Sequence, residues 1–369
     1  MASPLSATTQ HHQRCTECVP RTYADQSQLI PVLHTTYSAN EIMAGTHTAT
    51  QAFPLPPYDP EILAVEDTQH RPIPSGFHEL LELREEEPPR DEAIYNDPAI
   101  SIVDIVIPSP DEKISAIVLT HKFSKVQGEP RPGILFIHGG GRVMGNVYVG
   151  LSAVSHLIKE MDAVIISVNY RLSPDHPGIA AVEDCYASLV WMSENLEAYN
   201  VDLDRFMIAG VSAGAGLAAG TALLARDRKG PRVCAQLLVC PMLDDRCTNL
   251  SSLQFEDGRG FYTAWNRYAW SCILGSHPET DDVSIYVAPG RANDLSNLPR
   301  AYIDVGSGEP FRDENISYAM KLWECGVQAD LHVSGGGCHG FDLFFSTELG
   351  AEAIRTRNGW LRRILRERV

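Results

Sequence analysis

The run Gly210-Val211-Ser212-Ala213-Gly214 constrains the fold of this chain more than any other feature. It follows an apolar stretch, residues 206–209, that is typical of a buried strand, and it opens a stretch rich in small residues, 214–226, that is typical of a helix packed closely on a sheet. A strand that turns this sharply into a helix needs glycines where side chains would collide, and it exposes the serine at the end of the sheet. We therefore expect Ser212 at the edge of a sheet that is covered by helices.

From about residue 96 onward, strand-like and helix-like stretches alternate, which is the pattern of a mostly parallel sheet with helices on both faces. The strand-like stretches are residues 100–107, 114–120, 133–137, 163–169, 206–209, 236–240, 301–305 and 329–333, and the helical ones are about 149–161, 179–199, 214–226 and 348–366. The sequence thus predicts an α/β fold, with a mostly parallel central sheet flanked by helices.

The chain divides into three parts by composition and periodicity. Residues 1–50 are rich in Ser, Thr, Gln and His and show no sustained periodicity, which predicts a poorly ordered or irregular lead-in. Residues 51–95 combine helical periodicity with proline breaks and an acidic stretch, so we interpret them as a cap segment and linker. Residues 96–369 form the main domain, and its stretch at about 244–298 is too long for an ordinary connection, which predicts a helical cap inserted there.

Charge and composition narrow the classes of partner. The formal net charge of −17 at pH 7 argues against the basic surface that nucleic acids or anionic membranes require, so we expect a small-molecule partner. No apolar run approaches the length of a membrane span, and the first residues lack the basic start and apolar core of a secretory signal. Nine scattered cysteines, an odd number without the spacing of a disulfide framework, predict reduced thiols in a cytoplasmic protein.

One segment near the start of the chain holds residue types that bind metals. Residues 11–18 read His-His-Gln-Arg-Cys-Thr-Glu-Cys, but no second Cys/His pair follows at zinc-finger spacing. We interpret its two cysteines as incidental thiols, and we expect neither a metal nor a cofactor.

A second glycine-rich run, His138-Gly139-Gly140-Gly141, follows the strand-like stretch 133–137. Backbone N–H groups of such a loop, together with the N–H of the residue after the serine, stabilise the oxygen that becomes negative when a serine attacks an acyl carbon. Gly139, Gly140 and Ala213 are the expected donors. Either run alone is a weak match, whereas the two in this order favour Ser212 as a nucleophile.

A serine hydroxyl needs a neighbouring base, and in this arrangement the base follows both the serine and the acid along the chain. After Ser212 the histidines are His277, His332 and His339. His277 lies in the inserted stretch, and His332 lies in a strand-like stretch where burial on one face is its natural role. His339 lies in a glycine-rich loop just past the last strand, so we favour it as the base.

The acid that orients the base is expected in the loop after the strand-like stretch 301–305. This loop offers Glu309, Asp313 and Glu314. Pro310 begins a helix-like segment, and acids in the first turn of a helix commonly serve as partners of the helix dipole. Glu309 is therefore our choice, with Asp313 as its alternative.

These runs resemble those of the hormone-sensitive-lipase-like branch of the α/β-hydrolases, which are esterases with a His-Gly-Gly-Gly loop and a Ser-Ala-Gly turn. Residues 169–177 and 180–184, the pair Leu298-Pro299 and the run Arg312-Asp313-Glu314 are also similar to segments of this family. The likeness extends from about Tyr58 to the end of the chain.

The resemblance implies an α/β-hydrolase fold and a set of roles. It makes Ser212 the nucleophile, His339 the base and Glu309 the acid, and it makes the N–H groups of Gly139, Gly140 and Ala213 the oxyanion donors. It also implies a cap, built from the N-terminal region and the insertion at about 244–298, that shapes the acyl and alcohol pockets.

Three positions depart from the family pattern. Glu309 stands where the family usually has Asp, and Val211 stands where Asp or Thr is frequent. Arg142 replaces an apolar or aromatic residue after the glycines; we interpret it as solvent-facing, the alternative being a residue of the pocket mouth that favours a carboxylate-bearing substrate.

The inserted stretch is rich in aromatic residues, namely Phe255, Phe261, Tyr262, Trp265, Tyr268 and Trp270. Aromatics at this spacing are usually the packed face of a helix. The functional alternative is that some of them, with Trp265 and Tyr268 as candidates beside Arg142, line a substrate pocket.

Together these features predict a cytoplasmic carboxylesterase that cleaves small-molecule esters through an acyl-enzyme intermediate. The alternatives are a lactonase, acyltransferase or dehydratase of the same fold in a biosynthetic pathway, because the same groups serve all of these reactions. A non-catalytic receptor is a further alternative, since receptors of this family have lost the catalytic histidine, whereas this chain retains His339. A homo-oligomer is compatible with the sequence.

Overall fold

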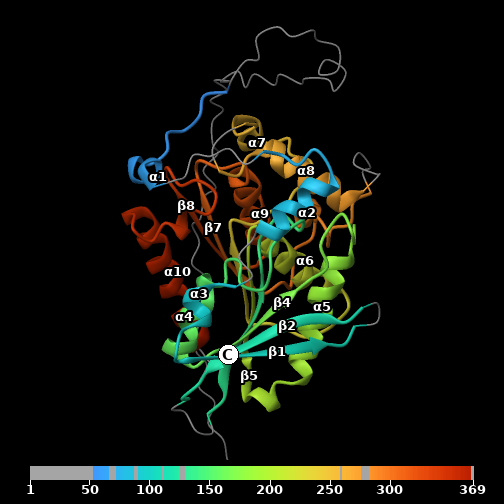
Figure 1. Ribbon diagram of the computed structural model, residues 1–369, viewed down its shortest axis with the longest axis vertical. Helices are drawn as coiled ribbons and strands as arrows, with labels where there is room; N and C mark the ends of the chain where they lie inside the picture. The colour runs from blue at the N-terminus through green and yellow to red at the C-terminus, as the bar shows by residue number, and fades with distance from the viewer. Residues whose placement is uncertain are drawn as a thin grey trace, which may run out of the picture. The chain divides into compact units, whose positions relative to one another are not determined.

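The computed structural model describes residues 53–65, 72–86, 90–109, 112–124, 129–257, 260–275 and 282–366. The lead-in expected over residues 1–50, with its His/Cys run at 11–18, lies outside the described residues, as does His277. Within them, eight strands form one sheet in the order β1-β2-β4-β3-β5-β6-β7-β8 (Figure 1). The strands are β1 (Ile100–Ile107), β2 (Ile114–His121), β3 (Arg131–Ile137), β4 (Val164–Asn169), β5 (Val201–Val211), β6 (Ala235–Val239), β7 (Arg300–Gly306) and β8 (Ala329–Ser334).

β2 pairs antiparallel with both β1 and β4, whereas every other neighbouring pair of the sheet is parallel. The helices are α1 (Pro60–Val65), α2 (Phe77–Glu86), α3 (Glu92–Tyr95), α4 (Ser152–Met161), α5 (Ala180–Glu194), α6 (Ala213–Asp227), α7 (Leu250–Gln254), α8 (Thr263–Leu274), α9 (Arg312–Glu324) and α10 (Glu348–Arg366), with 3-10 turns η1 (Glu197–Tyr199), η2 (Pro289–Arg291) and η3 (Phe341–Leu343). The predicted α/β class, with a mostly parallel sheet flanked by helices, is confirmed.

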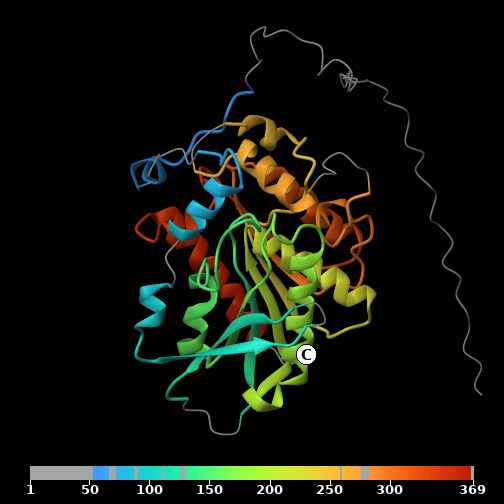
Figure 2. The same ribbon diagram turned by 45° about the vertical axis from the view of Figure 1, so that its right-hand side comes forward.

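The central strand β3 shows why the sheet is covered on both faces. Its residues Ile134 and Phe136 pack into a core shared with α4 and α10, and its residues Leu135 and Ile137 pack into a second core shared with α5, α6 and α9. Successive side chains of a strand point to opposite faces, so a strand buried on both sides is apolar throughout. Figure 2 shows the helices lying on the two sides of the sheet.

Four helices, α1, α2, α7 and α8, gather at one end of the molecule, at the top of Figure 1. Arg84 of α2 ties this end to the loops that follow β3 and β4, because its guanidinium donates to the carbonyl oxygens of Val143 at 2.6 Å and Ser173 at 2.8 Å. Tyr58, just before α1, packs its ring against Gly308 in the loop after β7. None of the described helices combines the length and apolarity that a membrane span needs.

Two element boundaries differ from the sequence-based expectation by five residues, more than any other. β5 begins at Val201, not at residue 206, because Val201 pairs with Arg131 across an irregularity in the register. The polar residues Asp202, Asp204 and Arg205 hide this extension from an apolar pattern. The helix expected over 179–199 ends at Glu194, and the chain continues through the 3-10 turn η1.

Candidate active site

Ser212 lies on the sharp turn between β5 and α6, with backbone angles φ 56° and ψ −120°. A positive φ is costly for a residue with a side chain, so the surrounding structure must hold it in place. Its N–H donates to the carbonyl of Val239 at 2.7 Å, and its own carbonyl accepts from Met242 at 3.1 Å. The serine is 8% exposed. It therefore stands fixed at the end of the sheet, as the glycine-flanked run predicts.

Gly214 explains why this turn tolerates no side chain behind the serine. A Cβ atom at this position would lie 2.2 Å from the carbonyl oxygen of Ile137 and 2.3 Å from that of His138. The start of α6 thus rests directly on the backbone that leads into the glycine-rich loop. This close approach places the two predicted runs side by side.

The structure brings His339 to Ser212. The Nε2 atom of His339 lies 3.0 Å from the Ser212 Oγ, and its Nδ1 atom lies 2.5 Å from Oε2 of Glu309. The histidine comes from the loop after β8 and the glutamate from the loop after β7. A backbone hydrogen bond of 2.8 Å from Gly308 to Gly337 ties these loops together. The serine, histidine and glutamate thus form a continuous chain of hydrogen bonds.

Glu309 is completely buried, and its second oxygen accepts the N–H of Gly306 at 2.8 Å. The extra methylene of glutamate, compared with aspartate, is taken up as the carboxylate turns back toward the end of β7. One N–H and one imidazole thus hold the two carboxylate oxygens in place.

The competing acids lie elsewhere. Asp313 accepts the N–H of Ser251 at 2.8 Å and pairs with Arg312 at 2.7 Å, so it anchors the start of α7. Glu314 is buried and accepts the N–H of Leu243 at 2.7 Å. Burial raises the pKa of Glu314 well above its usual range. Neither carboxylate hydrogen-bonds to His339 in the described part of the chain.

The remaining histidine candidate, His332, lies in β8 and stacks on Tyr302 with ring centroids 4.9 Å apart. Partial burial lowers the pKa of His332 below its usual value. The side chain is only half-buried, so the expected burial on one face of the strand is met in part.

The glycine-rich loop lies against the nucleophile. A Cβ atom on Gly139 would lie 3.6 Å from the Cβ of Ser212. Gly140 has φ +106°, and a Cβ there would lie 2.2 Å from the carbonyl oxygen of Met144, so the loop requires glycine at this position. Among the described residues, the N–H groups of Gly139, Gly140 and Ala213 have no backbone or side-chain acceptor. All three N–H groups are therefore unpaired within the part of the chain that the structure describes.

The side chains of His138 and Tyr170 pack against the backbone of this loop. No local sequence pattern marks either side chain for this role. Their rings stack with centroids 4.2 Å apart, and the Tyr170 hydroxyl donates to the carbonyl of His138 at 2.9 Å. The Nδ1 atom of His138 lies 2.8 Å from the carbonyl oxygen of Gly139. Complete burial lowers the pKa of His138 to about 4, so its ring is neutral at neutral pH.

Two phenylalanines pack against the ring of His339. The Phe261 centroid lies 5.0 Å from it and the Phe311 centroid 5.1 Å, the latter edge-on. Phe261 belongs to the aromatic set of the inserted stretch, whereas no local pattern distinguishes Phe311. The two phenylalanine centroids are themselves only 5.3 Å apart, so the rings form one apolar wall beside the imidazole.

The three predicted pocket residues lie at different places. Arg142 is not solvent-facing as expected: it is 1% exposed, with its guanidinium 5.2 Å from the centroid of Trp270. The burial follows from α8, which covers the loop after β3. Trp265 is 5% exposed. Its ring packs edge-on against Tyr268, with ring centroids 5.4 Å apart, and its centroid lies 6.4 Å from that of Phe261, which contacts His339. Tyr268 is only partly buried.

Cys240 lies next to the Glu309–His339 pair, with ligand-type atoms of all three residues within 4.8 Å of one another. Burial raises the pKa of the Cys240 thiol well above its usual range, so the thiol stays protonated at neutral pH. Metal binding needs a thiolate and a free imidazole nitrogen. Because both nitrogens of His339 are already hydrogen-bonded, we interpret Cys240 as a packing residue beneath the pair.

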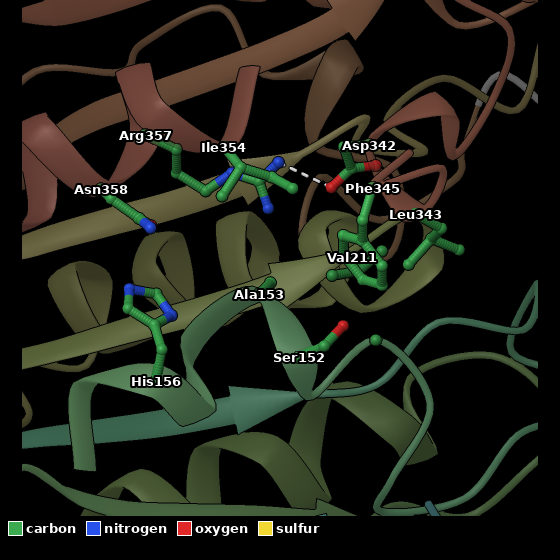
Figure 3. A pocket seen from close by; sticks show the side chains of 11 residues that line it. Ser152, Ala153, His156, Val211, Asp342, Leu343, Phe345, Ile354, Arg357 and Asn358 are labelled. Carbon is green, nitrogen blue, oxygen red and sulfur yellow. Dashed lines mark hydrogen bonds and ion pairs between the residues drawn. The ribbon is translucent and has the colours of Figure 1, made fainter. Parts of the chain in front are cut away.

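A cavity of about 170 Å³ opens beside Val211, the residue before Ser212. Figure 3 shows His156 of α4 on one side of this cavity, and Leu343 and Phe345 from the segment that follows His339 on the other. The Asp342–Arg357 ion pair, 2.6 Å long, also lines it. The cavity lies on the α4 and α10 side of the turn.

Arg357 also anchors the loops that hold the acid and the base. Besides its bond to Asp342 in η3, it contacts Asp304 in β7 at 3.2 Å, and all three residues are at least nine-tenths buried. Burial raises the pKa of Asp304 to about 6, although the arginine opposes this shift. The network joins α10 to the strand before Glu309 and to the turn after His339.

The sequence of this chain is similar to those of known esterases. The model of a family with the alpha/beta hydrolase fold matches residues 134–343. Esterase LipI of Mycobacterium tuberculosis is 34% identical over 249 residues, which cover 66% of this chain and 76% of that protein. An arylesterase of Saccharolobus solfataricus is 31% identical over 209 residues, 56% of this chain and 67% of that protein.

The fold of this chain is also similar to those of solved esterase structures. A bacterial heroin esterase superposes with a TM-score of 0.76 at 32% identity, covering 84% of this chain and 98% of that one. Esterase LipW from Mycobacterium marinum superposes with a TM-score of 0.75 at 30% identity, covering 85% and 99% of the two chains.

Proposed function

This chain belongs to the α/β-hydrolase fold family, in its hormone-sensitive-lipase-like branch, and from that premise we propose that it is a serine carboxylesterase that uses Ser212, His339 and Glu309 as its triad. It is a carboxylic ester hydrolase, as its relatives are. The observation that carries the triad is the hydrogen-bond chain of 3.0 Å from serine to histidine and 2.5 Å from histidine to glutamate. The retained histidine distinguishes this chain from receptors of the family that have lost it.

In the first half of the reaction, the Ser212 Oγ attacks the ester carbonyl carbon while Nε2 of His339 removes the hydroxyl proton. The carbonyl π electrons move to its oxygen, giving a tetrahedral oxyanion. When these electrons return, the bond to the alcohol oxygen breaks, and His339 gives its proton to that oxygen. The alcohol leaves, and the acyl group remains on Ser212.

In the second half, His339 removes a proton from a water molecule, whose oxygen attacks the acyl carbon. The new tetrahedral intermediate collapses with loss of the Ser212 oxygen, which takes the proton from His339. The carboxylic acid is released, and the serine hydroxyl is restored. Glu309 stabilises the imidazolium in both halves, because its buried carboxylate faces Nδ1 throughout.

The N–H groups of Gly139, Gly140 and Ala213 serve as the oxyanion hole. They lie on rigid backbone beside Ser212, so they stabilise the developing charge without reorganising. Removal of one hydrogen-bond donor of this kind typically lowers kcat by a factor of about 10²–10³.

We also propose that the protein acts in the cytoplasm on small-molecule esters, without a metal or cofactor. Seven cysteines fall in the described part of the chain, and all seven are free thiols, which supports a reducing compartment. The proposed nucleophile, base, acid and oxyanion donors account for ester hydrolysis by themselves, which supports a reaction without a metal or cofactor.

The test is hydrolysis of 4-nitrophenyl butanoate by the full-length protein. We expect Ser212→Ala to lose turnover by on the order of 10⁴–10⁶-fold. Ser271→Ala, which removes an exposed hydroxyl on α8, serves as the matched control and should keep wild-type rates. Equal rates in wild type and Ser212→Ala would overturn the proposal.

A further inference from the structure

Arg142 is a buried cation for which the described protein supplies no hydrogen-bond acceptor. Its side chain is 1% exposed, and none of its three guanidinium nitrogens has a partner. Burial lowers the pKa of Arg142 to about 10, so the group still carries its charge at neutral pH. A buried charge is costly unless hydrogen bonds and an opposite charge compensate for it.

The other fully buried arginine of the described chain is treated differently. Arg357 is held by two carboxylates, those of Asp304 and Asp342. The less buried Arg171 is held in the same way by Asp184, at 2.8 Å. Arg142 instead faces the aromatic ring of Trp270, and the groups near its guanidinium are the phenol of Tyr170 and the thiol of Cys185, not carboxylates.

The position of Arg142 links it to the proposed reaction. It directly follows the glycine-rich loop, and its carbonyl accepts the N–H of Ser173 at 2.8 Å, which fixes the backbone. Its Nη2 atom packs on Gly216 of α6, 3.3 Å from where a Cβ atom would stand. Gly216 lies four residues after Ser212, which is about one helical turn, or ~5 Å, along the axis. The guanidinium therefore packs against the first turns of the helix that begins directly after the nucleophile.

A guanidinium has five N–H donors in a planar fork, which matches a carboxylate in a two-point hydrogen bond. We propose that Arg142 binds a carboxylate of the substrate, so that the preferred substrates are esters with a free carboxylate in their acyl or alcohol half. This inference rests on the proposed esterase function. With a net charge of −17, the protein repels anions at long range, so recognition of such a substrate needs a local cation of this kind.

The experiment compares matched pairs of esters on the full-length protein. For the acyl half, the pair is mono-4-nitrophenyl glutarate and neutral 4-nitrophenyl pentanoate. For the alcohol half, the pair is 3-butanoyloxybenzoate and neutral phenyl butanoate. The readout is the ratio of kcat/KM for the charged ester to that for its neutral partner, because this ratio cancels a general loss of activity.

We expect the wild-type ratio to exceed one in one of the pairs, and that pair identifies the half that carries the carboxylate. Arg142→Met keeps a long apolar side chain and should lower this ratio by on the order of 10–100-fold, the value of a hydrogen bond to a charged group. Arg142→Lys keeps a cation but not the planar fork, so its ratio should lie between those of the wild type and Arg142→Met. Arg267→Met, on α8 with its side chain 45% exposed, removes one positive charge at a distance and should leave the ratio unchanged.

Binding is measured separately by calorimetry, with glutarate titrated into the Ser212→Ala protein with and without Arg142→Met. We expect the heat of binding to disappear in the double variant. Ratios at or below one in both pairs, or a ratio that Arg142→Met does not change, would overturn the inference while the esterase function stands. Failure of the proposed function would instead appear as no Ser212-dependent hydrolysis of any of the four esters.

Discussion

Glu309 and His339 meet through a hydrogen bond of 2.5 Å that spans the loops after two neighbouring parallel strands. The other oxygen of Glu309 is held by the N–H of Gly306, so the carboxylate is fixed at both ends. The longer side chain of glutamate is therefore part of the geometry, because it must reach both the end of β7 and the imidazole.

Substitutions of Glu309 test this relationship. Glu309→Gln should lower kcat by about 10²–10⁴, because an amide does not stabilise the imidazolium and can favour the wrong tautomer. The kcat of Glu309→Asp should lie between those of the wild type and Glu309→Gln, since the shorter carboxylate cannot keep both hydrogen bonds. Glu324→Gln, on the exposed face of α9, is the control. Full activity of Glu309→Gln would contradict the assignment of Glu309 as the acid.

The glycine-rich loop predicts a loss of turnover when Gly140 is changed. Gly140→Ala introduces a Cβ that would lie 2.2 Å from the carbonyl oxygen of Met144, so the loop must move. Displacement of one or more oxyanion donors should lower kcat by about 10²–10³. Gly359→Ala in α10 has open space around its Cβ, and we expect it to raise the free energy of unfolding by ~0.5–1 kcal/mol with normal turnover. Unimpaired turnover in Gly140→Ala would contradict the assignment.

His138 predicts a pH dependence of stability. Its pKa is lowered from 6.5 to about 4 in the folded protein, so the unfolded chain binds more protons between these values and stability falls as pH drops through this window. The shift corresponds to at most ~3 kcal/mol. Denaturant unfolding at several pH values should show this slope, and His138→Gln should flatten it relative to wild type. His176→Gln, at a side chain 42% exposed, should keep the wild-type slope. An unchanged slope in His138→Gln would contradict the assignment.

Arg357 predicts a large loss of stability. Arg357→Met leaves Asp304 and Asp342 buried without their cation, which should lower the free energy of unfolding by about 3–5 kcal/mol. Arg362→Met removes an exposed arginine of the same helix, 41% exposed, and should change stability by less than ~1 kcal/mol. Thermal or denaturant unfolding distinguishes the two, and equal losses would contradict a buried network.

Much of this architecture can be predicted from the sequence because local rules dictate it. The turn at Ser212 needs small residues at fixed positions, and the order of Ser212, Glu309 and His339 along the chain follows from the order in which parallel strands reach the same edge of the sheet. Glycines around His339 mark a loop past the last strand. These signals lie within a few residues of the groups that they identify.

The surroundings of the site depend on contacts between distant segments, which no local pattern reveals. The burial of Arg142 results from α8, more than 100 positions further along the chain, so the expectation of a solvent-facing side chain was wrong. Phe311 and Tyr170 look like ordinary core residues in sequence and gain their roles only where they meet His339 and His138. The apolar part of β5 can be predicted from the sequence, but its polar first residues cannot, because their extended conformation depends on pairing with β3.

The most direct test of the central claim is to detect the acyl-enzyme itself. The protein is mixed with excess 4-nitrophenyl butanoate and quenched in acid within the first turnovers, and the peptides are examined by mass spectrometry. We predict a butanoyl group on the peptide that contains Ser212, located on that serine, and its absence from Ser212→Ala. Rapid turnover of the ester with no acyl group on Ser212, or an acyl group on another residue, would contradict the account.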